Sequence, residues 1–331
     1  MLFLVLILCL GLNISLGSVD IPFKATLRHI FLNATSDDSW HYIIWNYRIP
    51  KAITAVLVGV GLSLSGLLMQ TLFRNPLAGP FVLGISSGAS LGAAFLIMGS
   101  GIIAGLIGTS FVNDISLAVA SSMGSLLVLM AVIAMARHVK DTMALLIIGL
   151  MFGSITAALV TVLSYFAKAE ELQQYIYWSF GTVGNLNWSQ VALLSIITII
   201  GLVISIFSIK SLNALLLGEN YARSMGVKIK KSRYLIIIAT GILAGSVTAF
   251  AGPIAFVGLA VPHLTRQVFN TTDHKVLVPG VILYGAILLL ICDTIAQLPS
   301  STYVLPINAI TSVIGAPVVI WLLVRKRKMI F

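Results

Sequence analysis

The sequence has few charged residues and almost no cysteine for its length. Only 9% of its 331 residues are Asp, Glu, Lys or Arg, whereas a soluble domain carries about 25%. Its two cysteines, Cys9 and Cys292, lie inside apolar runs, so neither a disulfide nor a metal site is indicated. Hydrophobic residues make up 59% of the chain. This balance excludes a soluble globular protein. Because the apolar runs are continuous rather than alternating, it predicts an all-α integral membrane protein and not a β-barrel.

The sequence also lacks the groupings of side chains that form an enzyme active site. Its five histidines are scattered, and none stands at metal-ligand spacing from an acid or a cysteine. We therefore expect no catalytic residue, no metal and no cofactor. Asp293 is the only acid well inside an apolar run, which makes it a functional hypothesis. Since it lies close to the predicted outer end of its helix, we expect a hydrogen-bonded, structural role for it.

Apolar runs divide the chain into about ten membrane crossings. The predicted helices are 2–17, 49–71, 81–100, 115–136, 143–166, 189–209, 234–251, a short piece ending near Phe269, 276–298 and 304–324. The single membrane domain, 1–331, would have outer loops at 18–47 and 167–188, a cytoplasmic loop at 212–233 and a basic tail at 325–331. We interpret 99–114 as a connection. The first run is expected to be a retained helix, with a cleaved signal peptide as the alternative.

The placement of basic residues supports this topology. With both termini in the cytoplasm, the inner loops hold 15 of the 20 Lys and Arg residues and three acids, and the outer side holds five basic residues and seven acids. Cytoplasmic loops of membrane proteins carry such an excess of Lys and Arg. The net charge of +10 therefore reflects orientation against membrane lipid, and no basic soluble domain exists to bind nucleic acid.

Motifs in both halves of the chain carry a family resemblance. The first half contains RIPK (48–51), GLSLSGLLMQ (61–70), RNPLAGP (74–80) and LGISSGA (83–89). The second half contains FVGLAVPHLTR (256–266), TDHK (272–275) and IGAPVVIWLL (314–323). In this order they resemble the permease of type II ABC importers, the uptake systems for ferric siderophores, haem and vitamin B12.

The resemblance implies a partner set and a function. The chain would form the translocation pathway as a homodimer in the bacterial inner membrane. It would work with two cytoplasmic ATPase subunits, which hydrolyse the ATP, and with one outer substrate-binding protein. The cargo would be a metal chelate, with ferric siderophore favoured over haem or cobalamin. The alternative is a self-contained secondary carrier for a small solute, which the scarcity of buried charge disfavours.

The cytoplasmic loop 212–233 resembles the family's ATPase-coupling segment. The matching residues are Gly218, Glu219, Ala222 and Gly226, with Met225 where the family usually has Leu. Glu219 would stand near a helix start, where negative charge is favourable, and Gly226 could end the helix in a left-handed turn. A plain basic loop beside anionic lipid is the alternative.

Two basic residues at the outer end of the second helix, Arg48 and Lys51, match positions that contact the binding protein in the family. Membrane-interface anchoring is the alternative role. The sequence departs from the family pattern nearby, because Gln297 replaces an Arg, Val304 a Glu and Asn308 a Gly. Because of these departures, the resemblance does not identify every residue of the docking surface.

Two further expectations concern the helices themselves. By position, Thr142 and Met143 at the inner mouth of the fifth helix would be gate residues. A stripe of small residues, Gly84, Gly88 and Gly92, predicts close helix packing. In addition, AGPFVLG (78–84) and AGPIAFVG (251–258) follow long helices of opposite predicted direction. They favour two inverted halves, an arrangement common in transporters, over a chance recurrence.

Overall fold

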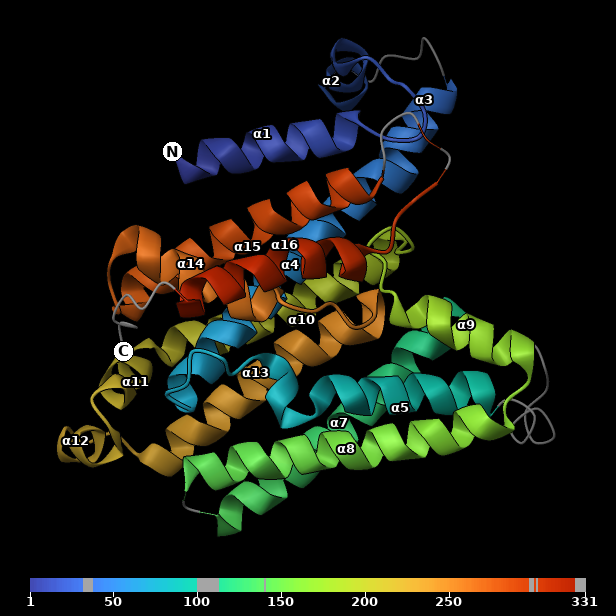
Figure 1. The fold of residues 1–331 in the computed structure, drawn as a ribbon. Coiled ribbons are helices and arrows are strands. Elements are labelled where there is room, and N and C mark those ends of the chain that lie inside the picture. Colours follow the sequence, from blue (N-terminus) through green and yellow to red (C-terminus); the bar gives the residue numbers. More distant parts are fainter. Residues whose placement is uncertain (32–37, 100–112, 140, 298–300, 302, 325–331) are drawn as a thin grey trace.

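The computed structural model describes residues 1–31, 38–99, 113–139, 141–297, 301 and 303–324, and every regular element in these ranges is a helix (Figure 1). The elements are α1 (Leu2–Ser15), α2 (Phe23–Phe31), α3 (Asp38–Ile43), η1 (Ile44–Arg48), α4 (Ile49–Leu72), η2 (Pro80–Leu83), α5 (Ile85–Met98), α7 (Asp114–His138), α8 (Thr142–Phe166), α9 (Ala169–Ser179), α10 (Trp188–Phe207), α11 (Ile209–Leu216), α12 (Glu219–Ser224), α13 (Ile229–Ala251), α14 (Val257–Phe269), α15 (His274–Ala296) and α16 (Ile307–Val324).

The all-helical prediction is confirmed for these residues. Six helical stretches are long and apolar enough to cross a membrane, and they contain α4, α7, α8, α10, α13 and α15. Three shorter apolar helices correspond to α1, α5 and most of α16. Together with α14, these helices fall on the ten apolar segments expected from the sequence, with ends that differ by a few residues.

Helix α4 forms the centre of the bundle. In the stretch Ser39–Leu72, 83% of the most apolar window is buried, against 17% for α8. Glycines allow this burial, because Gly59 lies directly against the backbone of Gly285 on α15, and Gly66 lies against Gly258 on α14. Neither contact leaves room for a Cβ atom. Close backbone approach at small residues is the usual means of packing helices in lipid.

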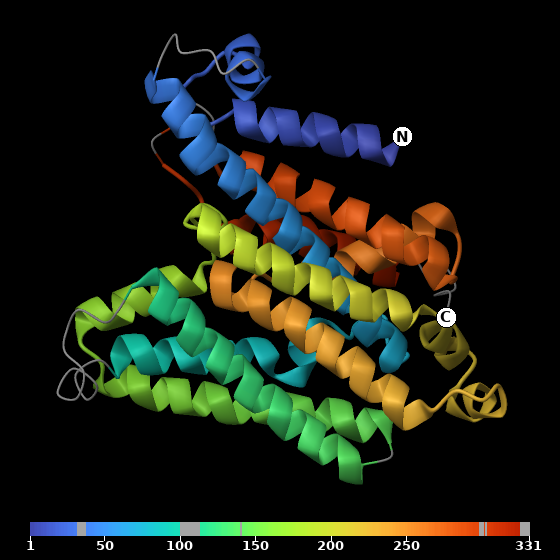
Figure 2. The ribbon, with the colours of Figure 1, turned by 180° about the vertical axis from the view of Figure 1, so that it is seen from behind.

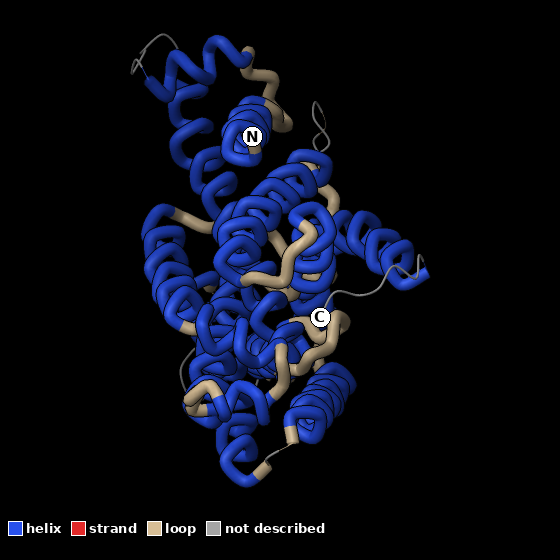
Figure 3. The backbone as a smooth tube through the Cα atoms, turned by 90° about the vertical axis from the view of Figure 1, so that its left-hand side faces the viewer, coloured by secondary structure: helices blue, strands red, loops and turns tan. Residues whose placement is uncertain are grey.

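The two ends of the bundle differ in the elements they carry. Helices α11 and α12 lie at one end, together with the beginnings of α8 and α13, and α9 lies at the other (Figures 1 and 2). Seen from the α12 end, the N-terminus faces the viewer (Figure 3). We refer below to the α12 end and the α9 end.

The segments expected as polar loops are more ordered than predicted. Residues 167–188 contain α9, whose N-terminal turn carries Glu170 and Glu171 and is closed by the Lys168 N–H donating to the Glu171 carboxylate at 3.2 Å. The loop 18–47 contains α2 and α3. Most of the connection expected at 99–114, and the tail at 325–331, lie outside the described residues.

The two AGP segments take similar courses. After α4 the chain breaks and restarts as α5 with Gly84 at the N-cap, where φ is +71°. After α13 it breaks and restarts as α14 with Phe256 at the N-cap, where φ is +65°. Both short helices thus begin from a residue in the left-handed region.

Candidate functional site

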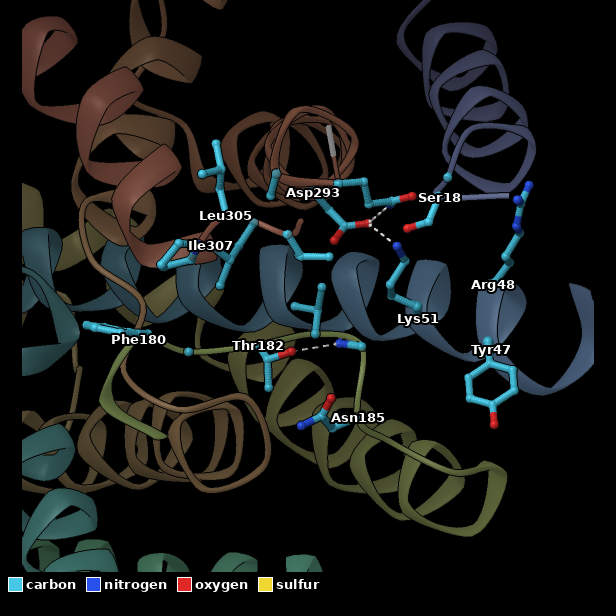
Figure 4. Close-up of a pocket in the computed structure, with 18 of the residues that line it drawn as sticks. Ser18, Tyr47, Arg48, Lys51, Phe180, Thr182, Asn185, Asp293, Leu305 and Ile307 are labelled. Atoms are coloured by element: carbon cyan, nitrogen blue, oxygen red, sulfur yellow. Dashed lines mark hydrogen bonds and ion pairs between the residues drawn. The ribbon is translucent and has the colours of Figure 1, made fainter. Parts of the chain in front are cut away.

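A cavity of about 520 Å³ opens at the α9 end of the bundle. Its walls come from segments far apart in the sequence, around residues 17–19, 43–51, 177–185, 293–297 and 304–307. Figure 4 shows Lys51 and Asp293 facing each other across its floor, whereas Arg48 points away from Asp293. The two basic residues predicted to act together therefore have different surroundings.

Arg48, which the resemblance places in contact with the binding protein, is not an exposed charge. Its side chain is buried, and its guanidinium donates to the carbonyl oxygens of Ile14 at 2.9 Å, Ser15 and Val19. These carbonyls belong to the end of α1 and the segment after it, where no further helical turn supplies N–H donors for them. The planar, five-donor guanidinium can satisfy several such acceptors at once. Arg48 therefore ties the chain after α1 to the start of α4.

Lys51 and Asp293 form an ion pair, with Nζ and Oδ2 3.5 Å apart. The same Asp293 oxygen accepts from Asn13 Nδ2 at 2.8 Å and from Gln297 Nε2 at 2.7 Å. The carboxylate is thus hydrogen-bonded by α1, α4 and its own helix, as predicted for Asp293. Gln297, which stands where the family often has an Arg, is buried in this network.

The other departures from the family pattern also have structural consequences at this end. Asn308 Oδ1 accepts from the Ala255 N–H at 3.0 Å, which fastens the start of α16 to the break before α14. A glycine at this position would offer no such acceptor. Val304 is exposed on the rim of the cavity.

The coupling segment occupies the α12 end. Gly218 is the N-cap of α12 with φ +102°, Glu219 is its first residue, and Gly226 follows it with φ +83°. Ala222 is fully buried against the bundle. This agrees with the helix start and the left-handed turn expected at Glu219 and Gly226.

The outward surface of this segment carries large apolar side chains. Leu217, Tyr221 and Met225 are 61%, 55% and 60% exposed. They recur every four residues, and exposed basic residues lie near them in the sequence, namely Arg223, Lys228, Lys230 and Lys231. Exposed apolar side chains rimmed by charge are typical of protein interaction sites.

The predicted gate residues lie at the same end. Thr142 Oγ1 donates to Glu219 Oε1 at 2.8 Å, so the first residue of α8 is bonded to the first residue of α12. Met143 is exposed beside it. Arg233 pairs with the same Glu219 oxygen at 2.9 Å, a contact that the sequence did not reveal. In the sequence, Arg233 is marked only by its position as a basic residue at the start of a long apolar helix.

A second polar junction at this end was also missed. Asp273, the N-cap of α15, accepts from the Lys275 N–H at 2.9 Å and from Asn213 Nδ2 of α11 at 2.7 Å. These bonds lower the pKa of the Asp273 carboxyl below its usual value. The TDHK motif therefore fastens α11, which leads into α12, to α15.

The glycine stripe lies at helix contacts. A Cβ atom on Gly88 would stand 2.6 Å from the Gly124 carbonyl oxygen of α7, and Gly92 lies against the Ala120 carbonyl oxygen. Gly84 instead faces α8, where a Cβ would be 2.9 Å from the Gly149 carbonyl oxygen. The stripe thus brings α5 close to two neighbours.

Comparison with known proteins identifies the family. Residues 4–325 match the FecCD transport family, and the chain belongs to it. The vitamin B12 import system permease protein BtuC of Salmonella paratyphi A (strain ATCC 9150 / SARB42) is 39% identical over 287 residues, covering 86% of this chain and 84% of that protein. BtuC of Salmonella typhi is 39% identical over 286 residues, with the same coverage. The resemblance drawn from the motifs is confirmed.

Solved structures agree with the fold. A chain assigned to the metal-chelate type of ABC transporter, in an inward-facing conformation, superposes with a TM-score of 0.84 at 28% identity and covers 98% of both chains. PsaBC from Streptococcus pneumoniae in complex with Fab superposes with a TM-score of 0.54 at 18% identity, over 82% of this chain and 89% of that one, and shares the fold alone.

Proposed function

We propose that the protein is the membrane-spanning subunit of an ATP-driven importer for a metal chelate. It would cross a bacterial inner membrane about ten times as two inverted halves with cytoplasmic termini. It would act as a homodimer with two ATPase subunits and one outer binding protein. The observation that supports this proposal is the outward surface of α12. Its side chains Tyr221 and Met225 are exposed at the end of the bundle where the basic loops gather.

The cargo is proposed as a class. Within the family that the motifs resemble, a ferric siderophore is the cargo we expect first, and the names of the B12 permeases that are similar to this chain favour cobalamin. Both are bulky metal chelates. Helix α8 carries no Asp, Glu, Lys, Arg or His between Thr142 and Phe166. A pathway lined by such a helix would leave selection of the cargo to the binding protein.

The first test separates an ABC permease from a secondary carrier. The protein is reconstituted with the ATPase and binding protein encoded beside it, and uptake of radiolabelled cobalamin and ferric siderophore is measured. We expect uptake to require ATP, to stop when the P-loop lysine of the ATPase is replaced, and to ignore a protonophore. Uptake by the permease alone, driven by an ion gradient, would support the carrier.

A second test concerns the docking surface on α12. Tyr221→Ser with Met225→Ser removes two exposed apolar side chains, each of the kind worth about 1–2 kcal/mol at an interface core. We expect capture of the ATPase to fall at least about tenfold, since each 1.4 kcal/mol is a factor of ten. Tyr42→Ser, at a similarly exposed tyrosine of α3, is the matched control and should leave capture unchanged.

For the binding protein, Lys51 is the better docking candidate of the two predicted residues. Its side chain is 18% exposed at the cavity, whereas Arg48 is committed to carbonyls of its own chain. Lys51→Glu should weaken docking and reduce its salt dependence, because exposed charges steer association and are screened by ions. Affinity is measured at low and high salt with Lys24→Glu as control. Unchanged affinity at low salt would remove Lys51 from the docking surface.

A further inference from the structure

The carboxylate of Glu219 on α12 is bonded by side chains from two other helices, α8 and α13. Its Oε1 accepts from Thr142 Oγ1 of α8 at 2.8 Å and from Arg233 Nη2 of α13 at 2.9 Å. The same Arg233 nitrogen lies 3.2 Å from Thr142 Oγ1, and Nη1 donates to the Val139 carbonyl oxygen at 3.1 Å. Since Val139 ends α7, one guanidinium bridges four elements. We call Thr142, Glu219 and Arg233 the junction.

The junction is partly shielded from water. The Arg233 side chain is 7% exposed and that of Glu219 35%. Charge-assisted hydrogen bonds are about twice as strong as neutral ones, and their electrostatic part strengthens where water is excluded. The planar guanidinium also holds its acceptors at fixed angles, which a lysine cannot do. The junction therefore resists relative displacement of the helices that it joins.

The covalent connection between α12 and α13 is a tight turn, in which the Gly226 N–H donates to the Arg223 carbonyl oxygen and the Val227 N–H to the Ala222 carbonyl oxygen, both at 3.0 Å. It runs through Gly226, which is exposed, has φ +83° and has no other atom within 4 Å of a Cβ position. Besides the buried Ala222, the junction is a side-chain connection between α12 and the bundle. It leads directly to Thr142, the first residue of α8.

Helix α8 is suited to move in response. It is the least buried of the long apolar helices, with 17% of its most apolar window buried. At its N-terminal end the Asp141 cap bonds only N–H groups of α8 itself, and Leu145 in the first turn is fully buried.

We propose, on the basis of the proposed function, that Arg233 is a positioning residue that couples movement of α12 on the ATPase to the first turn of α8. Glu219 then serves as an internal connection rather than a contact with the ATPase, and docking rests on the outward face of α12. This reassigns Glu219 and adds Arg233 to the residues needed for coupling.

The experiment measures ATP hydrolysis and cargo uptake in the same proteoliposomes, which contain the permease, its ATPase and its binding protein. Arg233→Met should lower cargo moved per ATP by about tenfold or more, since a hydrogen bond to a charged group contributes about 1.5–3 kcal/mol. The amount of bound ATPase should stay unchanged. Arg233→Lys should restore part of the ratio. Lys210→Met, which removes an exposed charge on α11, should behave as wild type.

Thr142→Val provides a second, gentler variant that keeps the shape of the side chain and removes only the hydroxyl group. It should lower cargo moved per ATP in the same direction, with full assembly. If Arg233→Met fails to fold, Thr142→Val decides the question. Exchanging the pair, Glu219→Arg with Arg233→Glu, should recover part of what either change loses alone.

Two results would overturn the proposal. A wild-type ratio of uptake to hydrolysis in Thr142→Val and Arg233→Met would show that the junction carries no force. Loss of the ATPase from a folded Arg233→Met permease would show that Arg233 only shapes the docking surface. If the wild-type protein itself binds no ATPase, the proposed function fails, and this outcome is distinct from the other two.

Discussion

Arg48 and Lys51 stand one helical turn apart, yet the chain uses their charges in different ways. Arg48 donates to three carbonyls at the end of α1 and just after it, and Lys51 faces the carboxylate of Asp293. A short sequence motif shows that two cations are present. It does not show which acceptors surround each of them. The acceptors come from residues 14–19 and from α15. Only the folded chain brings them to the start of α4.

The first prediction tests the role of Arg48. Arg48→Met should lower the free energy of unfolding by roughly 2–4 kcal/mol, because it leaves partly buried carbonyl oxygens without donors. Melting temperature in detergent is the measurement, and Arg48→Lys should recover only part of the loss. Lys24→Met, at an exposed residue of α2, is the control. A stable Arg48→Met protein that fails only in docking would restore Arg48 to the docking surface.

The second prediction concerns pH and Asp273. Its hydrogen bonds from the Lys275 N–H and from Asn213 favour the carboxylate, so its pKa is lower in the folded protein than in the unfolded chain. The resulting stabilisation is complete above the unfolded pKa of about 3.9 and is lost as pH falls through the folded pKa.

Asp273→Asn keeps an acceptor at the N-cap but has no charge to lose. Its stability deficit relative to wild type should therefore be largest near neutral pH and shrink below about pH 4. Melting curves of both proteins in detergent between neutral pH and pH 3 measure this difference. A constant deficit across the range would show that the charge of Asp273 contributes nothing.

At the scale of the element, glycines determine how close the helices come. Gly88 and Gly124 place α5 against α7, and Gly59 and Gly285 place α4 against α15. Small residues at every fourth position predicted such packing for α5, but the sequence did not say which helix would be the partner. That choice depends on the complementary glycine, which lies 36 residues away for Gly88 and much further for Gly59.

The third prediction is that Gly88→Leu separates α5 from α7. Overpacking of this kind costs about 1–3 kcal/mol or more, because even a Cβ would approach the Gly124 carbonyl oxygen to 2.6 Å. Expression and melting temperature in detergent should both fall. Gly153→Ala is the control, since its Cβ would lie at ordinary contact distances, 3.4 Å from the Ser87 hydroxyl and 3.9 Å from the Gly84 Cα. Equal stability of the two variants would contradict the packing role of Gly88.

Elements outside the apolar runs were the hardest to predict. Helix α9 lies in a segment expected to be a loop, although Glu170 and Glu171 in its first turn are a helix-start signal. The apolar runs were found because a membrane requires every backbone group to bond within its own helix. No such requirement acts on α2, α9 or α12, and their helices depend on caps and local contacts.

At the scale of the whole molecule, polar networks lie at the two ends of the bundle and uncharged packing lies between them. Asp293 and Lys51 mark the α9 end, and Glu219, Arg233 and Asp273 mark the α12 end. The sequence predicted this distribution, because charge is excluded from the apolar runs. It could not predict the pairs, since Asn13 and Asp293 are 280 positions apart and no local pattern links them.

The last prediction concerns which end faces the cytoplasm. Helices α9 and α12 lie at opposite ends (Figure 1), separated in the chain by α10 and the short α11. The excess of Lys and Arg in the loops around α12 assigns that end to the cytoplasm, because basic loops are retained there. Cys9 and Cys292 are both buried, so replacing them with Ala provides a background for single-cysteine labelling.

In that background, Glu170→Cys in α9 should react with a membrane-impermeant maleimide in intact spheroplasts, and Lys231→Cys should not. In inside-out vesicles the pattern should reverse, since both side chains are exposed and belong to opposite ends of the bundle. Labelling of both residues from one side would mean that α10 does not cross. The opposite pattern would place α12 on the outer face, where no ATPase could reach it, and the proposed function would fail with the topology.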